Sequence, residues 1–496
     1  GRPQAPPERG PLAWRADVEA RLEACRAAWR ARLEPFELEL PGAAADVARA
    51  LQAQVGWILV NRDSAGVQPG SRSYARSWIR DGSLTCTALL RTGHPRPVRE
   101  FIEWFAPWQY ASGKVPCCVG PLGSDPVPEH DSGGEFIYLV AEYYRHTGDL
   151  ALVERHWPAV AAAAGYLDSL RRLRRTPEWR VPGREEFFGL LPPSISHEGY
   201  SAEPMHSYWD DLFALRGFKD AAFLAGVLGR ADDAIRLAGI RDEFQRDLAA
   251  SLRAAMARHH IDYVPGCADK GDFDATSTTI ALDPAQAEDA LPPGALERTF
   301  ERYWGFFRDR ASGAEPWENY TPYEMRAVGA LARLGWRERA DSALAYFLGH
   351  RNPPGWQQWG EIVWRDTRTA RFIGDLPHTW VGSDFVRSVL DLLAFERGRD
   401  SSLVLAAGVP AAWLAEPGLR LRGLSTSYGR LDCTLRRRGG DVEARIGAGL
   451  RVPPGGVVLR PPGRFRRATV DGAPAALGPV GEVVLRALPA TVVFRR

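Results

Sequence analysis

The fold class that the sequence predicts is mainly α-helical: an (α/α)6 toroid with a small C-terminal β-sandwich domain. Three observations predict it. Helical periodicity dominates to about residue 397, amphipathic helices alternate with helices that are apolar all round, and short alternating runs follow after about residue 400. A chain of 496 residues is also too long for one ordinary core. We therefore expect a flexible tail over 1–12, the helical domain over 13–399 and the β-sandwich over 400–496.

The helical domain is predicted as pairs of helices. Outer, amphipathic helices are expected near 46–61, 96–110, 149–174, 229–257, 285–304 and 336–349, after an extra leading helix near 15–33. The inner partner of each begins near Asp81, Asp131, Asp210, Asp274, Glu318 and Trp380 respectively. The run from Phe136 to Ala141 is apolar on every side, which is typical of a helix that is covered all round. Six outer and six inner helices are what the toroid requires.

The C-terminal region carries the strand signals. Turn sequences such as Arg438-Gly439-Gly440-Asp441 and Pro453-Pro454-Gly455-Gly456 separate short apolar runs, for example 457–459 and 491–494. This spacing of short strands and turns favours a sandwich.

The inner helices should all direct their N-termini to one end of the toroid, where the residues that open them would gather. Asp and Asn at a helix start are ordinary N-caps, worth about 1 kcal/mol each. Capping does not explain the aromatic, basic and imidazole side chains beside them, so we expect a ligand-binding cleft. The expected binding residues are Trp78, Arg80, Asp81, Asp131, Glu135, His206, Trp209, Asp211, Trp317, His378 and Trp380.

Composition narrows the ligand class. The net charge of +2 gives no general attraction to nucleic acid. The sequence contains no run of about 18 apolar residues, so no membrane span is predicted. The 17 tryptophans suit stacking on the apolar faces of sugar rings, although Trp also fills helical cores. The six cysteines show no metal-binding spacing and no nucleotide fingerprint is present, so neither a metal nor a cofactor is expected.

One motif resembles a known family. The segment Ser77-Trp78-Ile79-Arg80-Asp81-Gly82 is similar to the Trp-Ile-Arg-Asp motif of glucoamylase-type inverting hydrolases, which share this fold with trehalases and α-glucosidases. In those enzymes the Arg-Asp pair grips hydroxyls of the terminal sugar. The resemblance therefore implies a first sugar subsite at Arg80 and Asp81.

The resemblance also implies a catalytic acid. Glucoamylases carry it in a Trp-Glu-Glu motif that opens the third inner helix, and their relatives carry an Asp there. Here Ser207-Tyr208-Trp209-Asp210-Asp211 opens that helix. Asp210 is thus the predicted general acid, with Asp211 second, and Trp209 could raise its pKa by excluding water.

The general base of these families lies before or at the last inner helix. The loop Gly355-Trp356-Gln357-Gln358-Trp359-Gly360-Glu361-Ile362 fits this place, so Glu361 is the predicted base and Trp359 a binding residue. Glu318, in Pro316-Trp317-Glu318-Asn319-Tyr320, is the rival. A loop Glu could equally be an exposed partner in a salt bridge.

The expected function is exo-acting, inverting hydrolysis of an oligosaccharide, of the α-glucoside type, by two carboxylates. Three alternatives remain open. A glycoside phosphorylase would replace the base with a phosphate site of Arg, His and Ser. A polysaccharide lyase or sugar epimerase would use a pair such as His206 and Tyr208. A non-catalytic sugar-binding protein would hold its carboxylates too far apart or pointing away from each other. Fold alone does not choose between them.

Overall fold

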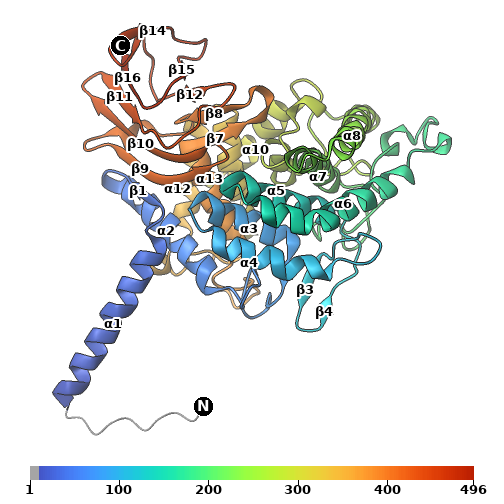
Figure 1. Ribbon diagram of the computed structural model, residues 1–496, viewed down its shortest axis with the longest axis horizontal. Coiled ribbons are helices and arrows are strands. Elements are labelled where there is room, and N and C mark those ends of the chain that lie inside the picture. The colour runs from blue at the N-terminus through green and yellow to red at the C-terminus, as the bar shows by residue number, and fades with distance from the viewer. Residues whose placement is uncertain (1–10) are drawn as a thin grey trace.

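The computed structural model describes residues 11–496, and within them the predicted toroid is present (Figure 1). The outer helices are α2 (Ala45–Val60), α4 (Pro95–Phe105), α6 (Leu150–Arg172), α8 (Ala231–His259), α10 (Ala295–Ser312) and α12 (Arg337–Gly349). The inner helices are α3 (Ile79–Arg91), α5 (Ser132–Thr147), α7 (Tyr208–Val227), α9 (Ala275–Leu282), α11 (Arg326–Arg333) and α13 (Thr379–Leu393). Each inner helix contacts the next and α13 contacts α3, so the inner ring closes.

The inner helices are covered on all sides, as their apolar composition predicts. Every residue of α13 is buried, and so is every residue of α5 from Ser132 to Ala141. Glycine allows the closest approach in the ring: a Cβ on Gly134 of α5 would lie 2.1 Å from the backbone oxygen of Phe213 on α7. The Gly133-Gly134 pair therefore serves helix packing as well as the start of α5.

The fifth inner helix differs from the prediction. It begins at Arg326 and not near Glu318, because Pro322 opens a 3₁₀ turn (Pro322–Met325) ahead of it. Residues Asn319–Tyr320 form instead a short strand, β5, that pairs with β6 (Val363–Trp364). Glu318 is thus placed outside the ring of inner-helix N-termini.

Two sheets form the C-terminal region. The larger has the order β1 (Glu37–Glu39), β9 (Leu419–Thr426), β10 (Gly429–Arg438), β11 (Asp441–Ile446), β16 (Ala490–Arg495), β13 (Arg467–Val470) and β14 (Ala473–Ala475), with all neighbours antiparallel. The smaller has the order β15 (Val483–Leu485), β12 (Val457–Leu459), β8 (Ser402–Leu405) and β7 (Ala394–Arg397). Both sheets contribute side chains to the same apolar core as the toroid. They also take strands from before residue 400, since β1 and β7 belong to them.

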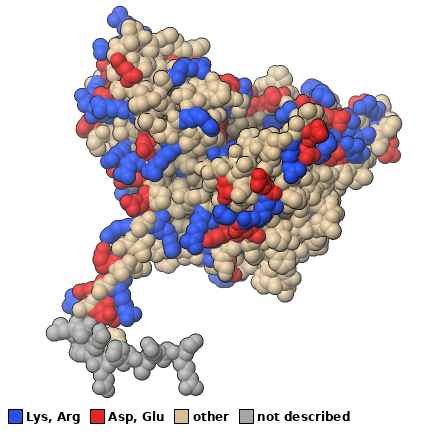
Figure 2. All heavy atoms as spheres, in the orientation of Figure 1, with Lys and Arg blue, Asp and Glu red and all other residues tan. Residues whose placement is uncertain are grey.

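The leading helix α1 (Pro11–Leu33) extends away from the rest of the molecule (Figure 1). The expected tail over 1–12 lies outside the described residues, apart from its last two, which belong to α1. Among the described helices, none combines the length and apolar character that a bilayer crossing requires. Basic and acidic side chains are interspersed over the face shown in Figure 2, so neither sign dominates it.

Candidate active site

A cavity of about 480 Å³ lies where the inner helices begin, a size that is ordinary for a small-molecule site. Its walls come from the starts of α3, α9, α11 and α13 and from the loops around residues 69–74, 197–199, 321–323 and 361. The lining residues are Pro69, Tyr74, Trp78, Arg80, Asp81, His197, Glu198, Gly199, Asp274, Thr276, Ser277, Thr321, Tyr323, Arg326, Glu361, His378 and Trp380. The predicted gathering of helix-opening residues at one end of the toroid is therefore present.

The floor of the cavity carries Arg80 within a group of carboxylates. The Arg80 Nη1 donates to Glu129 Oε2 at 2.7 Å and lies 3.8 Å from Asp131, while Nη2 lies 3.7 Å from Glu198. Burial raises the pKa of Asp81 to about 8; the charge of Arg80 opposes this shift and the charge of Glu198 adds to it. At neutral pH Asp81 is therefore protonated, and its Oδ2 has no hydrogen-bond partner within the described chain.

Glu361 lies on the loop before β6 and faces the cavity between two tyrosines. Its Oε2 accepts a hydrogen bond from Tyr74 and its Oε1 accepts one from Tyr323 at 3.1 Å. Gly374 (φ +70°) packs against it so closely that a Cβ there would come within 2.7 Å of the Glu361 Cβ. Burial, and then the bond to Glu361, raise the pKa of Tyr74, so this tyrosine stays a donor. The carboxylate is thus held in one orientation.

Aromatic rings form the wall at the start of α13. The Trp380 ring packs on Tyr323 with centroids 4.4 Å apart, and Arg326 lies 5.0 Å from its centroid. Arg326 is itself paired with Asp384 at 2.7 Å. Burial lowers the pKa of His378 to about 3, so this imidazole is neutral. The Nε1 of Trp380 is buried and has no hydrogen-bond partner among residues 11–496, so it can donate to a ligand.

The loop before α7 contributes an exposed carboxylate, Glu198. A pair of backbone hydrogen bonds between Ser194 and Met205 closes this loop. Trp78 Nε1 donates to Glu198 Oε1 at 3.1 Å, and the Glu198 side chain remains 52% exposed at the cavity. Its backbone has φ +66°, a conformation that non-glycine residues rarely adopt and that is enriched at functional sites.

Asp210, the predicted general acid, does not line the cavity. It is 1% exposed, and its two oxygens accept hydrogen bonds from the hydroxyls of Ser194 and Ser196. Burial, assisted by the charge of Asp131, raises its pKa to about 8. Asp211 is buried as well and accepts from the Leu191 backbone N–H at 3.0 Å. The correction has a simple cause: the loop over residues 194–205 covers the start of α7.

Glu318, the predicted rival base, also lies elsewhere. Its side chain is 65% exposed and pairs with Arg371 in a separate surface depression, where Trp317 also lies. Trp359 is fully buried, donates to the Phe347 carbonyl at 2.9 Å and packs on Phe385. Neither tryptophan reaches the cavity.

Four further predicted binding residues lie outside the lining of the cavity: Asp131, Glu135, His206 and Trp209. Asp131 accepts from Trp209 Nε1 at 2.8 Å, and Trp209 in turn stacks beneath His197. Glu135 is buried, and burial raises its pKa strongly. His206 is engaged with Asp269 at 3.0 Å. Tyr208 contacts the Ser251 hydroxyl, so the His206 and Tyr208 pair considered for a lyase does not face the cavity.

Several lining residues were not predicted from the sequence: Tyr74, His197, Glu198, Ser277, Tyr323 and Arg326. Tyr323 and Arg326 were missed because the start of the fifth inner helix was placed too early. Tyr74 and Glu198 lie in loops without periodicity, and no local signal distinguishes them from other loop residues.

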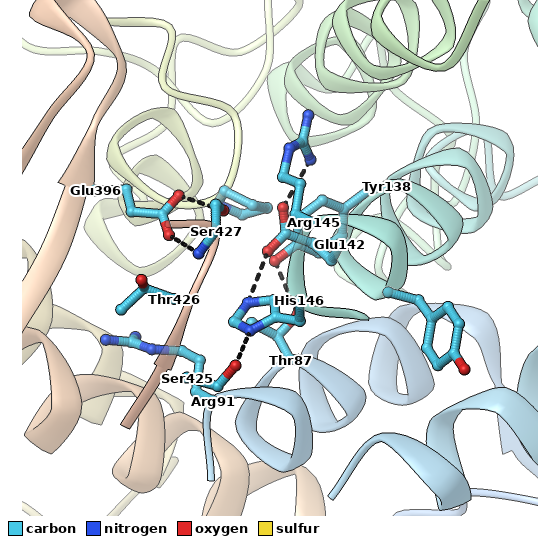
Figure 3. A network of polar contacts seen from close by, with 12 residues as sticks. Thr87, Arg91, Tyr138, Glu142, Arg145, His146, Glu396, Ser425, Thr426 and Ser427 are labelled. Carbon is cyan, nitrogen blue, oxygen red and sulfur yellow. Dashed lines mark hydrogen bonds and ion pairs between the residues drawn. The ribbon is translucent and has the colours of Figure 1, made fainter. Parts of the chain in front are cut away.

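A second hollow of about 460 Å³ lies at the opposite ends of α3 and α5, against the sheets. Here polar groups bind one another: His146 Nδ1 contacts Ser425 Oγ at 2.8 Å, and Glu396 accepts from the Ser427 N–H and hydroxyl (Figure 3). None of the buried polar atoms that lack a partner in the described chain belongs to its lining, whereas Arg80, Asp81 and Trp380 of the first cavity each have one. The first cavity is therefore the better ligand site.

One group in the described part of the chain has donors suited to a metal: Cys117 Sγ, Cys118 Sγ and an Asp125 oxygen lie within 4.8 Å of one another. Arg76 Nη1 lies 3.9 Å from Cys118 Sγ and 3.9 Å from an Asp125 oxygen. The group packs behind Trp78, outside the cavity lining.

No protein-family model and no curated protein matches this sequence. Solved structures do share its fold. The α-L-rhamnosidase from Dictyoglumus thermophilum has a TM-score of 0.59 at 11% identity, covering 93% of this chain and 50% of that one. The GH78 family rhamnosidase of Bacillus sp. GL1 has a TM-score of 0.61 at 14% identity, covering 86% and 43%. The α-L-rhamnosidase of Streptomyces avermitilis, complexed with L-rhamnose, has 0.59 at 16%, covering 93% and 42%.

These likenesses define the class of fold: an (α/α)6 toroid accompanied by β-sandwich strands. The chain spans about half the length, or less, of each of the three rhamnosidases.

Proposed function

We propose that this chain is a glycoside hydrolase that uses Glu361 as its general base. The single observation that carries the proposal is the cavity at the helix N-termini, where Glu361 is fixed by Tyr74 and Tyr323 opposite the Arg80–Asp81 pair. A carboxylate held between two donors can orient a water molecule for attack on an anomeric carbon. Asp81, protonated and with no hydrogen-bond partner on Oδ2 among the described residues, can donate to a sugar hydroxyl.

Charge favours a neutral sugar as the substrate. The described lining contains four carboxylates (Asp81, Glu198, Asp274 and Glu361) and two arginines, each of which is paired with carboxylates. No cation of the lining is left over for a phosphate or a uronate, and the His378 imidazole is neutral. This balance supports hydrolysis over phosphorolysis and over a lyase that acts on uronates.

A panel of substrates tests which sugar the protein cleaves. The Trp-Ile-Arg-Asp motif favours an α-glucoside, whereas the structural neighbours are named for α-L-rhamnosides. Aryl glycosides and disaccharides of both sugars are incubated with wild type, Glu361→Gln and Glu318→Gln. We expect wild type to release one of the sugars without added phosphate, Glu361→Gln to lose at least a thousandfold in kcat/KM, and Glu318→Gln to match wild type within a factor of about two. Cleavage that requires phosphate would contradict the proposal.

A further inference from the structure

We propose that Glu198, on the loop that covers Asp210, is the proton donor to the leaving glycosidic oxygen. The assignment rests on the proposed hydrolase function and deepens it. An inverting hydrolase needs a carboxylic acid that touches the scissile oxygen as well as a base. Asp210 does not touch the cavity, so the donor must be one of the carboxylates that do.

Three candidates for the donor remain beside Glu361, and two of them are unsuitable. Asp81 lies on the floor at 3% exposure beside Arg80, where a sugar ring would be gripped and not where an aglycone would leave. Asp274 caps α9: its Oδ1 accepts from the Ser277 N–H at 2.9 Å and its Oδ2 from the Ser277 hydroxyl. Glu198 has the most exposed side chain of the three, at 52% against 27% for Asp274, and it lies along the cavity where a leaving group would depart.

The environment of Glu198 suits both halves of a proton transfer. Trp78 Nε1 donates to Oε1 at 3.1 Å, and Oε2 has no partner among the described residues, so Oε2 is free to contact the glycosidic oxygen. The Nη2 of Arg80, 3.7 Å from Oε1, stabilises the carboxylate that remains. The proton passes from Oε2 to the glycosidic oxygen as its bond to the anomeric carbon breaks. Water attacks that carbon and gives its proton to Glu361, and exchange with solvent restores both groups.

The loop is built to hold this side chain in place. His197 stacks on Trp209 with ring centroids 4.9 Å apart, and its Nε2 lies 3.2 Å from the Ser277 hydroxyl. The Glu198 carbonyl accepts from the Ser201 hydroxyl at 2.7 Å, which favours the unusual φ of +66°. Asp210 anchors the same loop through the hydroxyls of Ser194 and Ser196. In this arrangement Asp210 is a positioning residue.

The test exploits the dependence of acid catalysis on the leaving group. Dinitrophenolate departs without protonation, whereas methoxide does not. Dinitrophenyl and methyl α-glucosides and α-L-rhamnosides are compared for wild type, Glu198→Gln, Asp210→Asn and Glu203→Gln. Glu203 lies on the same loop but outside the cavity lining, and is the matched control. Circular dichroism and melting confirm that each variant is folded.

We expect Glu198→Gln to lose at least a hundredfold in kcat/KM on the methyl glycoside but less than tenfold on the dinitrophenyl glycoside, with Glu203→Gln unchanged. Equal losses on both substrates, or none on the methyl glycoside, would overturn the assignment. So would the leaving-group signature in Asp210→Asn in place of Glu198→Gln. If Glu361→Gln is inactive on both substrates while Glu198→Gln shows no signature, the hydrolase proposal survives and only this assignment fails. A wild type inert on every substrate overturns both.

Discussion

At the scale of single residues, the site is defined by which carboxylates line the cavity. Glu361 and Glu198 line it, whereas Asp210, Asp211 and Glu318 lie outside its lining and contact other groups. Asp81 also lines the cavity, and although it is buried, its Oδ2 has no hydrogen-bond partner in the described chain. Accessibility and hydrogen bonding, more than residue type, therefore separate the candidate roles.

The tyrosines on Glu361 give the first prediction. Tyr74→Phe removes a donor that orients the carboxylate, and a hydrogen bond to a charged group is worth about 1.5–3 kcal/mol. We expect kcat to fall by roughly tenfold to a hundredfold with little change in KM, because the bond serves the attacking water more than sugar binding. Steady-state kinetics measure this, with Tyr428→Phe in the second hollow as a control that should be neutral. A changed KM with an unchanged kcat would contradict this role.

Asp210 gives a prediction about pH. Its pKa is about 8 in the folded protein and about 4 when unfolded, so between these pH values the folded state holds a proton that the unfolded state has lost. This contribution to stability is full below pH 4 and is lost progressively as pH rises to 8, by roughly 1 kcal/mol per pH unit. Asp210→Asn cannot titrate. The free energy of unfolding of Asp210→Asn, measured by urea titration, should therefore rise relative to that of wild type as the pH increases from 4 to 8. If the two free energies change with pH in parallel, the raised pKa is refuted.

At the scale of elements, the six helix pairs could be predicted because each outer helix has one apolar face and each inner helix has several. The fifth pair shows where this fails: Pro322 delays α11 to Arg326, and periodicity cannot locate such a delay. The loop that carries Glu198 could not be predicted at all, since it has no repeating pattern. Asp210 was misplaced because α7 is buried around its whole start, so the sequence gives no preferred face.

The close contact between α5 and α7 leads to a prediction about stability. Gly134→Ala would place a Cβ 2.1 Å from the Phe213 carbonyl oxygen, and backbone atoms on both helices must move. We expect a loss of about 3 kcal/mol or more, at the upper end of overpacking effects. Gly165→Ala, in the exposed middle of α6 with nothing within 4 Å, is the matched control and should stabilise by about 0.5–1 kcal/mol. Chemical denaturation compares the two, and equal effects would contradict the close packing of this ring.

At the scale of the whole molecule, the toroid and the sheets share one apolar core. Their seam contains the polar network of Figure 3, in which Glu396 binds Ser427 and His146 contacts Ser425. The sequence change near residue 400 predicted separate domains, and this division remains a prediction. Composition could show where strands begin, but not that β1 and β7 join their sheets from the helical side.

The shared core predicts the outcome of truncation. A chain ending at residue 399 would expose the apolar side chains of α13 and β7 that the sheets cover, and would leave Glu396 without its partners. We expect such a chain to be insoluble or to melt without a cooperative transition, as measured by calorimetry, whereas the full chain melts cooperatively. A soluble, cooperatively melting 11–399 fragment would show instead that the toroid folds alone.

The most direct test of the central claim is NMR of the anomeric proton of the first sugar released, recorded before mutarotation, for wild type and Glu361→Gln. The account predicts that wild type releases a sugar of inverted configuration and that Glu361→Gln releases none on the same timescale. Retention of configuration would contradict the base role of Glu361 by requiring a nucleophile. Undiminished release by Glu361→Gln would show that Glu361 is not the general base.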